Sequence, residues 1–223
     1  MSFFDELNRA SQKHREYLLS APIIRTCMLE GLSLENYVAF LQQAYHHVKH
    51  TTPLLMATGA RLPESKEWLR EAVAEYIKEE VGHQEWILND IEACGFDKEK
   101  ARRSTPNIST EMMVSYAYDT INRVSPLGFF GMVHVLEGTS VNIADLAADK
   151  IQEKLGLPDQ MFSYLRSHGK LDQDHVKFFE GLMNRIDDLG EQAQIIHAVS
   201  RFYRLYADIF RELAPEQALL IAA

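Results

Sequence analysis

The chain has 223 residues, of which 46% are hydrophobic and 25% are charged, and its formal net charge at pH 7 is −9. This composition is typical of a globular protein and excludes a disordered or fibrous chain. The acidic balance argues against a nucleic-acid partner, because phosphate binding requires clustered basic residues. No run of about twenty apolar residues is present, so we expect no membrane-spanning segment and no membrane partner.

The two cysteines, Cys27 and Cys94, lie in neither a CxxC pair nor a nucleophile motif. A disulfide framework is therefore not expected. The first twenty residues carry recurrent charges and lack the apolar core of a secretory signal peptide. The sequence thus predicts a protein of the reducing cytoplasm.

Helical periodicity dominates the chain, and no alternating strand pattern is convincing. The predicted helices cover residues 3–19, 22–30, 34–60, 64–94, 109–123, 127–155, 159–168, 171–187 and 191–213. Ser33 is expected to cap the third helix, and Pro53 should kink or split it. Gly95, Gly156 and Gly190 are expected to follow helix ends.

Residues 95–107 form the longest predicted irregular segment, which we interpret as a solvated connector within one domain. No internal repeat or low-complexity tract is present. We therefore expect a single all-α domain over residues 1–223, in which residues 215–223 form a short apolar tail.

Two polar residues interrupt the apolar face of the predicted helix 64–94. The apolar positions of that face are Leu69, Val73, Tyr76, Ile87 and Ile91. Glu80 and His83 occupy the same face, one helical turn apart. A buried carboxylate needs a compensating partner, and an inward-facing Glu-x-x-His is the arrangement that di-iron bundles use. A local Glu–His pair at the exposed edge of the face is the alternative interpretation.

The predicted helix 127–155 shows the same anomaly. Its buried face is formed by Phe130, Val133, Val141 and Ala144, and Glu137 lies in the middle of it. His134 precedes Glu137 by one turn. We interpret His134 as a hydrogen-bonded core histidine that supports a ligand, and Glu137 as a candidate ligand.

A third group of ligand-type residues is His168, Asp172 and His175, spaced at four and three residues. His175 continues into an apolar face through Phe179, Leu182 and Ile186. The alternative is that Asp172 is an ordinary acidic residue in the first turn of a helix. Together the three groups supply carboxylates and imidazoles without thiolates, which suits iron or manganese better than structural zinc.

In this order and spacing, the residues resemble the heme-oxygenase-like di-iron oxidases, which are related in fold to thiaminase II and pyrroloquinoline-quinone synthase. The resemblance rests on EEVGH at residues 79–83, on the isolated Glu137 and on the segment from His168 to His175. It spans essentially the whole chain and implies a heme-oxygenase-like helical bundle of seven to nine helices. The six metal ligands that it implies are Glu80, His83, Glu137, His168, Asp172 and His175, with Glu79 as an alternative to Glu80.

The function implied by this resemblance is that of an oxygen-dependent oxidoreductase with a non-heme di-iron centre. The co-substrate would be dioxygen, and the substrate a small amine, amino acid or fatty acid, or a residue of the protein itself. Manganese is an alternative metal, an external reductant would be a further partner, and a homodimer is common for the fold. No catalytic residue is assigned beyond the ligands.

Other functions of the same fold stay open at this point. They are a metal-free enzyme of the pyrroloquinoline-quinone synthase type, a thiaminase-II-like enzyme and a non-catalytic interaction protein. Thiaminase II carries a cysteine nucleophile on the helix where this chain has Glu137, and neither Cys27 nor Cys94 falls there. His14 is the one candidate for the N-terminal histidine that binds heme in heme oxygenases, and no supporting signature accompanies it.

The expected substrate pocket is lined by aromatic side chains, namely Tyr37, Phe40, Tyr45, Tyr116 and Tyr118, although each could equally be a core residue. We expect His46, His47 and His50 to be partly solvated, with one of them possible as a pocket residue.

Overall fold

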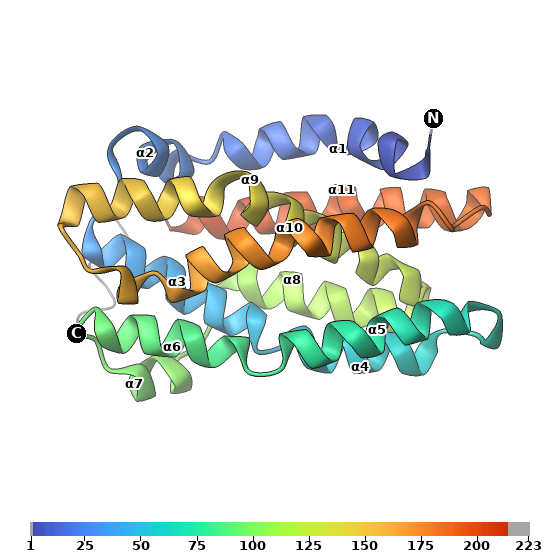
Figure 1. Cartoon of the computed structure of the whole chain (residues 1–223), viewed down its shortest axis with the longest axis horizontal. Helices are drawn as coiled ribbons and strands as arrows, with labels where there is room; N and C mark the ends of the chain where they lie inside the picture. Colours follow the sequence, from blue (N-terminus) through green and yellow to red (C-terminus); the bar gives the residue numbers. More distant parts are fainter. Residues whose placement is uncertain (1, 214–223) are drawn as a thin grey trace.

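The computed structural model describes residues 2–213, except for the side chains of residues 168–174. Every regular element in the described range is a helix, which confirms the predicted all-α class. Most helices run along the long axis of the molecule, side by side in a bundle (Figure 1). The predicted tail at residues 215–223 lies outside the described residues.

The α-helices are α1 (Phe3–Leu19), α2 (Pro22–Glu30), α3 (Leu34–Val48), α4 (Thr51–Arg61), α5 (Glu67–Glu80), α6 (His83–Ala93), α7 (Lys98–Arg103), α8 (Ile108–Asp119), α9 (Phe129–Leu155), α10 (Ser163–Met183) and α11 (Leu189–Glu212). Single turns η1 (Glu64–Lys66), η2 (Thr120–Val124), η3 (Pro126–Gly128) and η4 (Asp159–Met161) lie between some of them. As predicted, Ser33 caps α3 by accepting a hydrogen bond from the Asn36 amide, and Gly156 ends α9 with a φ of 65°.

The predicted third helix is split into α3 and α4, and Pro53 lies in the first turn of α4, where its missing N–H is tolerated. Three other predictions were wrong. Residues 95–107 contain the short helix α7, because Asp97 caps it. The predicted helices 159–168 and 171–187 are not separated, since α10 runs without a break from Ser163 to Met183. Gly190 lies in the first turn of α11, whose cap is Asp188.

Helix α9 packs against α2, α10 and α11. Its contact with α11 is close at Gly131, where an added Cβ would lie 2.8 Å from the Cβ of Ala198 and 2.8 Å from the Val199 nitrogen. Only glycine allows this approach of two helix backbones. Helices α5 and α6 follow one another along one side of the bundle (Figure 1).

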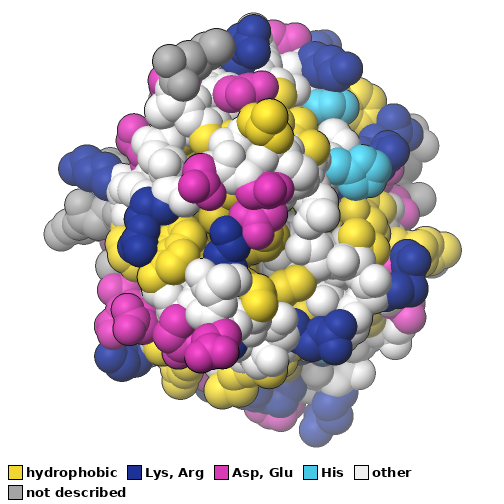
Figure 2. Space-filling view, turned by 90° about the vertical axis from the view of Figure 1, so that its right-hand side faces the viewer, with side chains coloured by type: hydrophobic (Ala, Val, Ile, Leu, Met, Phe, Trp, Pro, Cys, Tyr) yellow, Lys and Arg dark blue, Asp and Glu magenta, His cyan; other side chains and the backbone are white. Residues whose placement is uncertain are grey.

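At one end of the bundle, acidic and basic side chains are interspersed, with hydrophobic atoms visible between them (Figure 2). That face shows no extended basic area of the kind that phosphate backbones require. None of the helices within residues 2–213 combines the length and apolar character needed to cross a lipid bilayer.

Candidate metal centre

The predicted helix 64–94 is broken where its two polar residues lie, which corrects the expectation of one continuous helix. Helix α5 ends at Glu80 and α6 begins at His83. Between them Val81 is extended and Gly82 has a φ of 96°, a conformation that residues with a Cβ rarely adopt. Glycine at position 82 therefore sets how α6 restarts relative to the end of α5.

Glu80 and His83 still meet across this break. The Glu80 Oε2 atom lies 3.1 Å from the His83 Nδ1 atom, and the two side chains are 11% and 5% exposed. Trp86 stacks on the His83 ring with 4.0 Å between ring centroids, which holds the orientation of the imidazole. The motif thus lies inside the molecule, and the alternative of an exposed pair at the edge of the face does not apply.

His175 on α10 reaches the same place from a distant part of the chain. Its Nδ1 atom lies 3.6 Å from Glu137 Oε1 and 4.0 Å from Glu80 Oε1, while its Nε2 atom lies 2.7 Å from Glu79 Oε2. The ring also packs edge-on against Tyr76, with centroids 5.5 Å apart. One ring nitrogen therefore faces the carboxylates of Glu137 and Glu80, and the other is held by Glu79.

This arrangement separates the two neighbouring glutamates. Glu80 is turned inward, whereas the Glu79 side chain is 57% exposed and contacts the outer nitrogen of His175. A carboxylate that accepts from the far nitrogen of a metal-binding histidine fixes its tautomer and ring orientation. Glu79 fits that supporting position, and Glu80 fits the position of a ligand.

Four of the six predicted ligands, Glu80, His83, Glu137 and His175, therefore converge from α5, α6, α9 and α10. Glu137 is 12% exposed and His175 8% exposed, so the group is largely shielded from water. The side chains of His168 and Asp172 lie outside the described residues, although their backbone belongs to α10. Within the described side chains, no three His, Cys, Asp or Glu residues already surround one ion position.

The chemistry of the donors nevertheless fits iron. Two carboxylates and two imidazoles, without a thiolate, form the mixed oxygen and nitrogen set found in di-iron bundles. In their present positions the carboxylates and imidazoles contact one another directly. A polar partner of this kind is the expected compensation when carboxylates are brought together inside a protein. Metal binding would require these direct contacts to part, so that the donors face an ion.

His134, predicted as a supporting core histidine, is 6% exposed and its Nε2 atom lies 3.3 Å from the Ser11 hydroxyl. Burial first, and then the neighbouring Arg15 charge, lower the pKa of His134 to about 4. The imidazole is therefore neutral at physiological pH. It faces α1, one helical turn from Glu137.

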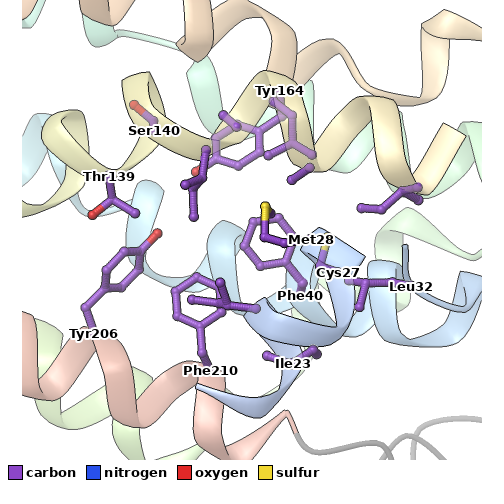
Figure 3. A pocket seen from close by; sticks show the side chains of 16 residues that line it. Ile23, Cys27, Met28, Leu32, Phe40, Thr139, Ser140, Tyr164, Tyr206 and Phe210 are labelled. Atoms are coloured by element: carbon purple, nitrogen blue, oxygen red, sulfur yellow. The ribbon is translucent and has the colours of Figure 1, made fainter. Parts of the chain in front are cut away.

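One small cavity adjoins the converging side chains, and a second small cavity adjoins the first. The first, which we call the inner cavity, has a volume of about 90 Å³ and is lined by Glu80, Glu137, Tyr76 and His47 among others. The second, the apolar cavity, has about 80 Å³ and shares Ser140, Tyr164 and Tyr206 with the inner cavity. Figure 3 shows the hydroxyl groups of Tyr206 and Ser140 at one end of the apolar cavity, and Cys27 and Leu32 towards the other.

The predicted pocket aromatics lie mostly elsewhere. Of the five, only Phe40 lines one of these two cavities. Tyr37 stacks on Phe162 and donates to the Met161 carbonyl oxygen, Tyr116 packs on Phe202, and Tyr118 contacts His50. Tyr45 packs against His46. Helical periodicity places an aromatic residue inside the bundle, but it does not distinguish the core from a cavity wall.

His46 and His47 are 1% and 3% exposed, so the expectation that they are partly solvated was wrong. His47 lines the inner cavity, in line with the expectation that one histidine of this group could be a pocket residue. One residue that supports the site was not predicted. Asp90 on α6 is fully buried and accepts hydrogen bonds from the backbone amides of Ser163 and Tyr164. It thereby fixes the start of α10, the helix that carries His175. Its position three residues after Ile87 gave no sign of this role.

Neither cysteine is activated. Burial raises the pKa of Cys27 and that of Cys94 to about 11, so both thiols are protonated at neutral pH. A nucleophilic cysteine needs the opposite shift. His14 lies part-buried on α1, where burial and the charges of Lys13 and Arg201 lower its pKa, and it lines neither the inner nor the apolar cavity.

A family model described as iron-containing redox enzyme matches residues 38–207. The chain belongs to this family. The matched range contains all six predicted ligands, and the family is heme-oxygenase-like, as the sequence resemblance implied. The iron cofactor of the family agrees with the donor chemistry of the converging side chains.

Solved structures with the same fold cover nearly the whole chain. A domain of unknown function with a heme oxygenase-like fold from Shewanella denitrificans is 21% identical, with a TM-score of 0.86 over 100% of this chain and 96% of that chain. A TenA homologue from P. horikoshii is 12% identical, with a TM-score of 0.79 over 96% and 98%. The heme oxygenase from Leptospira interrogans is 15% identical, with a TM-score of 0.75 over 95% and 100%. At these identities the likeness establishes the fold alone, and no curated protein sequence gives a significant match.

Proposed function

We propose that this iron-containing redox enzyme is an oxygen-dependent oxidoreductase that uses a non-heme di-iron centre to oxidise a small organic substrate. The observation that supports the proposal most is the convergence of two largely shielded carboxylates and two buried imidazoles on one place. Glu137 carries most weight, because its oxygen lies 3.6 Å from His175 in an otherwise apolar part of α9. A carboxylate there needs compensation that hydrophobic packing cannot give.

The ligands in this proposal are Glu80, His83, Glu137 and His175, joined by His168 and Asp172 of α10. Iron would supply dioxygen activation and the electron transfer that side chains lack. Glu79 holds the outer nitrogen of His175, and the Trp86 and Tyr76 rings hold the two imidazoles in orientation. The burial of the four described donors excludes bulk water from the place of reaction.

Substrate and dioxygen would reach the centre through the cavities that adjoin Glu80 and Glu137. We further propose a cytoplasmic homodimer that receives electrons from an external reductant. The two buried, protonated thiols suit a reducing compartment. Sedimentation equilibrium would test the dimer, and a mass of one chain of 25.6 kDa would contradict it.

A thiaminase-like mechanism is the weaker candidate, because the two thiols are protonated and Glu137 stands in place of a nucleophile. A metal-free enzyme and a non-catalytic protein are separated from the oxidase by metal content. The test is therefore iron stoichiometry after anaerobic loading with ferrous iron. We expect close to two irons per chain in the wild type, and the loss of at least one in His175→Ala.

The matched control is His197→Ala, which removes an exposed histidine of α11 and should leave the iron content unchanged. Both variants should keep the helical circular dichroism of the wild type, so that a loss of iron is not a loss of fold. Wild-type protein that stays iron-free after loading would overturn the oxidase proposal.

A further inference from the structure

A larger cavity lies on the other side of Glu137 from the inner cavity. This outer cavity has a volume of about 210 Å³ and is enclosed by α1, α9, α10 and α11. Its polar wall residues are Asn8, Arg15, His134, Glu137, Asn142 and Tyr203. An engineered protein cavity of about 150 Å³ accepts benzene, so this space is large enough for a small ring with a substituent. Any molecule bound here would touch the carboxylate that we assign to the metal centre.

Gly138 gives a reason to regard this space as a binding site. It follows Glu137 in the middle of α9, where glycine destabilises a helix relative to alanine. Gly131 of the same helix is explained by its close approach to α11, but a Cβ at Gly138 would meet no heavy atom within 4 Å. Packing within the described part of the chain therefore does not explain why residue 138 is a glycine. The absence of a side chain at this position leaves space next to Glu137 in the outer cavity.

Arg15 gives the site its charge. Among the described wall residues of the inner, apolar and outer cavities, it is the only lysine or arginine. It lines the outer cavity together with Tyr203 and His134. Burial raises the pKa of Tyr203 and lowers that of His134, and the positive charge of Arg15 acts to lower the pKa of both side chains. Because His134 is neutral at physiological pH, the positive charge of this cavity comes from Arg15.

We propose that the outer cavity binds the carboxylate of a small organic acid, with Arg15 as its counter-ion and the rest of the acid over Gly138 against Glu137. The planar guanidinium fork matches the two oxygens of a carboxylate. One cation balances a monoanion, whereas inorganic phosphate brings nearly two negative charges next to Glu137. This inference deepens the proposed function, since it makes an organic acid the substrate class, while the apolar inner walls suit dioxygen.

The test compares benzoate with benzamide, which has the same shape without the charge. Their affinities for the full chain would be measured by calorimetry or ligand-observed NMR, on metal-free protein and again after anaerobic loading with ferrous iron. Benzoate should bind about tenfold more tightly than benzamide in at least one of the two states, as expected for charged hydrogen bonds. Arg15→Gln should lower benzoate affinity to that of benzamide.

The control is Arg9→Gln on the same helix, because the Arg9 side chain is 67% exposed and pairs with Glu6. It should leave both affinities unchanged. Gly138→Ala should weaken both probes by filling the space, without lowering the melting temperature, so a failure to fold cannot imitate the result. Equal or absent binding of benzoate and benzamide in both states would overturn the proposal. So would a benzoate preference that survives Arg15→Gln, or tighter binding of inorganic phosphate than of benzoate.

The two proposals fail separately in this design. Benzoate binding that depends on Arg15 in a protein that takes up no iron would leave the acid site standing and overturn the oxidase. Iron uptake without any benzoate preference would do the reverse.

Discussion

Two regions of the molecule carry the carboxylates of the proposed metal centre, and they position these carboxylates in different ways. Helix α9 carries Glu137 in an unbroken run of 27 residues, which a close contact at Gly131 holds against α11. Helices α5 and α6 carry Glu80 and His83 on the two sides of a break, whose geometry depends on the left-handed Gly82. A long helix is positioned by its neighbours, whereas a broken one is positioned by the backbone angles of the break.

This difference predicts different consequences of disturbing each region. A substitution that disturbs the packing of α9 should lower the free energy of unfolding of the whole bundle, because the helix contacts both α10 and α11. A substitution at the break should mainly change the relative positions of Glu80 and His83, whose 3.1 Å contact spans it.

The largest expected effect comes from filling the α9–α11 contact. Gly131→Val would place its Cβ 2.8 Å from the Val199 nitrogen, a backbone atom that cannot move aside alone. We expect a loss of about 3 kcal/mol in the free energy of unfolding, as for severe overpacking. Urea denaturation followed by circular dichroism measures it. Gly181→Ala on α10 is the control, since its Cβ meets nothing within 4 Å, and an equal loss there would refute the packing explanation.

The next effect concerns pH and again belongs to the α9 region. The pKa of His134 is about 4 in the folded protein, because of burial, against about 6.5 in an unfolded chain. The unfolded state therefore takes up the proton first, so the stabilisation is complete above pH 6.5 and is lost as the pH falls towards 4. Linkage gives a loss of about 2 kcal/mol between pH 7 and pH 5 from this group.

His134→Gln should remove that part of the pH dependence while keeping a polar group beside Ser11. Chemical denaturation at pH 7 and pH 5 compares the two proteins. If the variant loses as much stability as the wild type over this interval, His134 does not titrate as its burial implies.

The smallest loss of stability is expected at the break between α5 and α6. Its structural effect should be confined to the neighbourhood of Glu80 and His83. Gly82→Ala forces a side chain into a left-handed conformation and should cost about 1–2 kcal/mol. Gly95→Ala is a matched control, because Gly95 has a φ of 86° and, like Gly82, open space around its Cβ position. Both variants should be destabilised by similar amounts, but only Gly82→Ala should lose iron after anaerobic loading. Equal iron contents would show that the break does not set the ligand geometry.

The sequence alone was sufficient for the parts of this fold that depend on local chemistry. The cap at Ser33 and the helix end at Gly156 follow from side chains that act within a few residues. The inward direction of Glu137 and His175 follows from helical periodicity, because both lie in line with apolar residues of their own helix.

The remaining features depend on contacts between distant segments, which periodicity does not contain. Gly82 could as well have continued the helix, since glycine permits but does not require a left-handed turn. His47 and Tyr206 line the inner cavity because α3 and α11 meet α9 there, and neither has a distinguishing neighbour in the sequence. Phe40 is the one predicted pocket aromatic that lines the apolar cavity. Periodicity alone could not distinguish it from the four predicted aromatics that do not line this cavity.

We propose that Glu80, His83, Glu137 and His175 are ligands of one iron centre. X-ray diffraction at the iron absorption edge, from crystals loaded anaerobically with ferrous iron, would locate the metal itself. We expect two anomalous peaks per chain between α5, α6, α9 and α10, within bonding distance of these four side chains. Iron bound elsewhere in the chain would contradict this proposal. It would also be contradicted if no anomalous peak appeared and the four side chains kept their direct contacts.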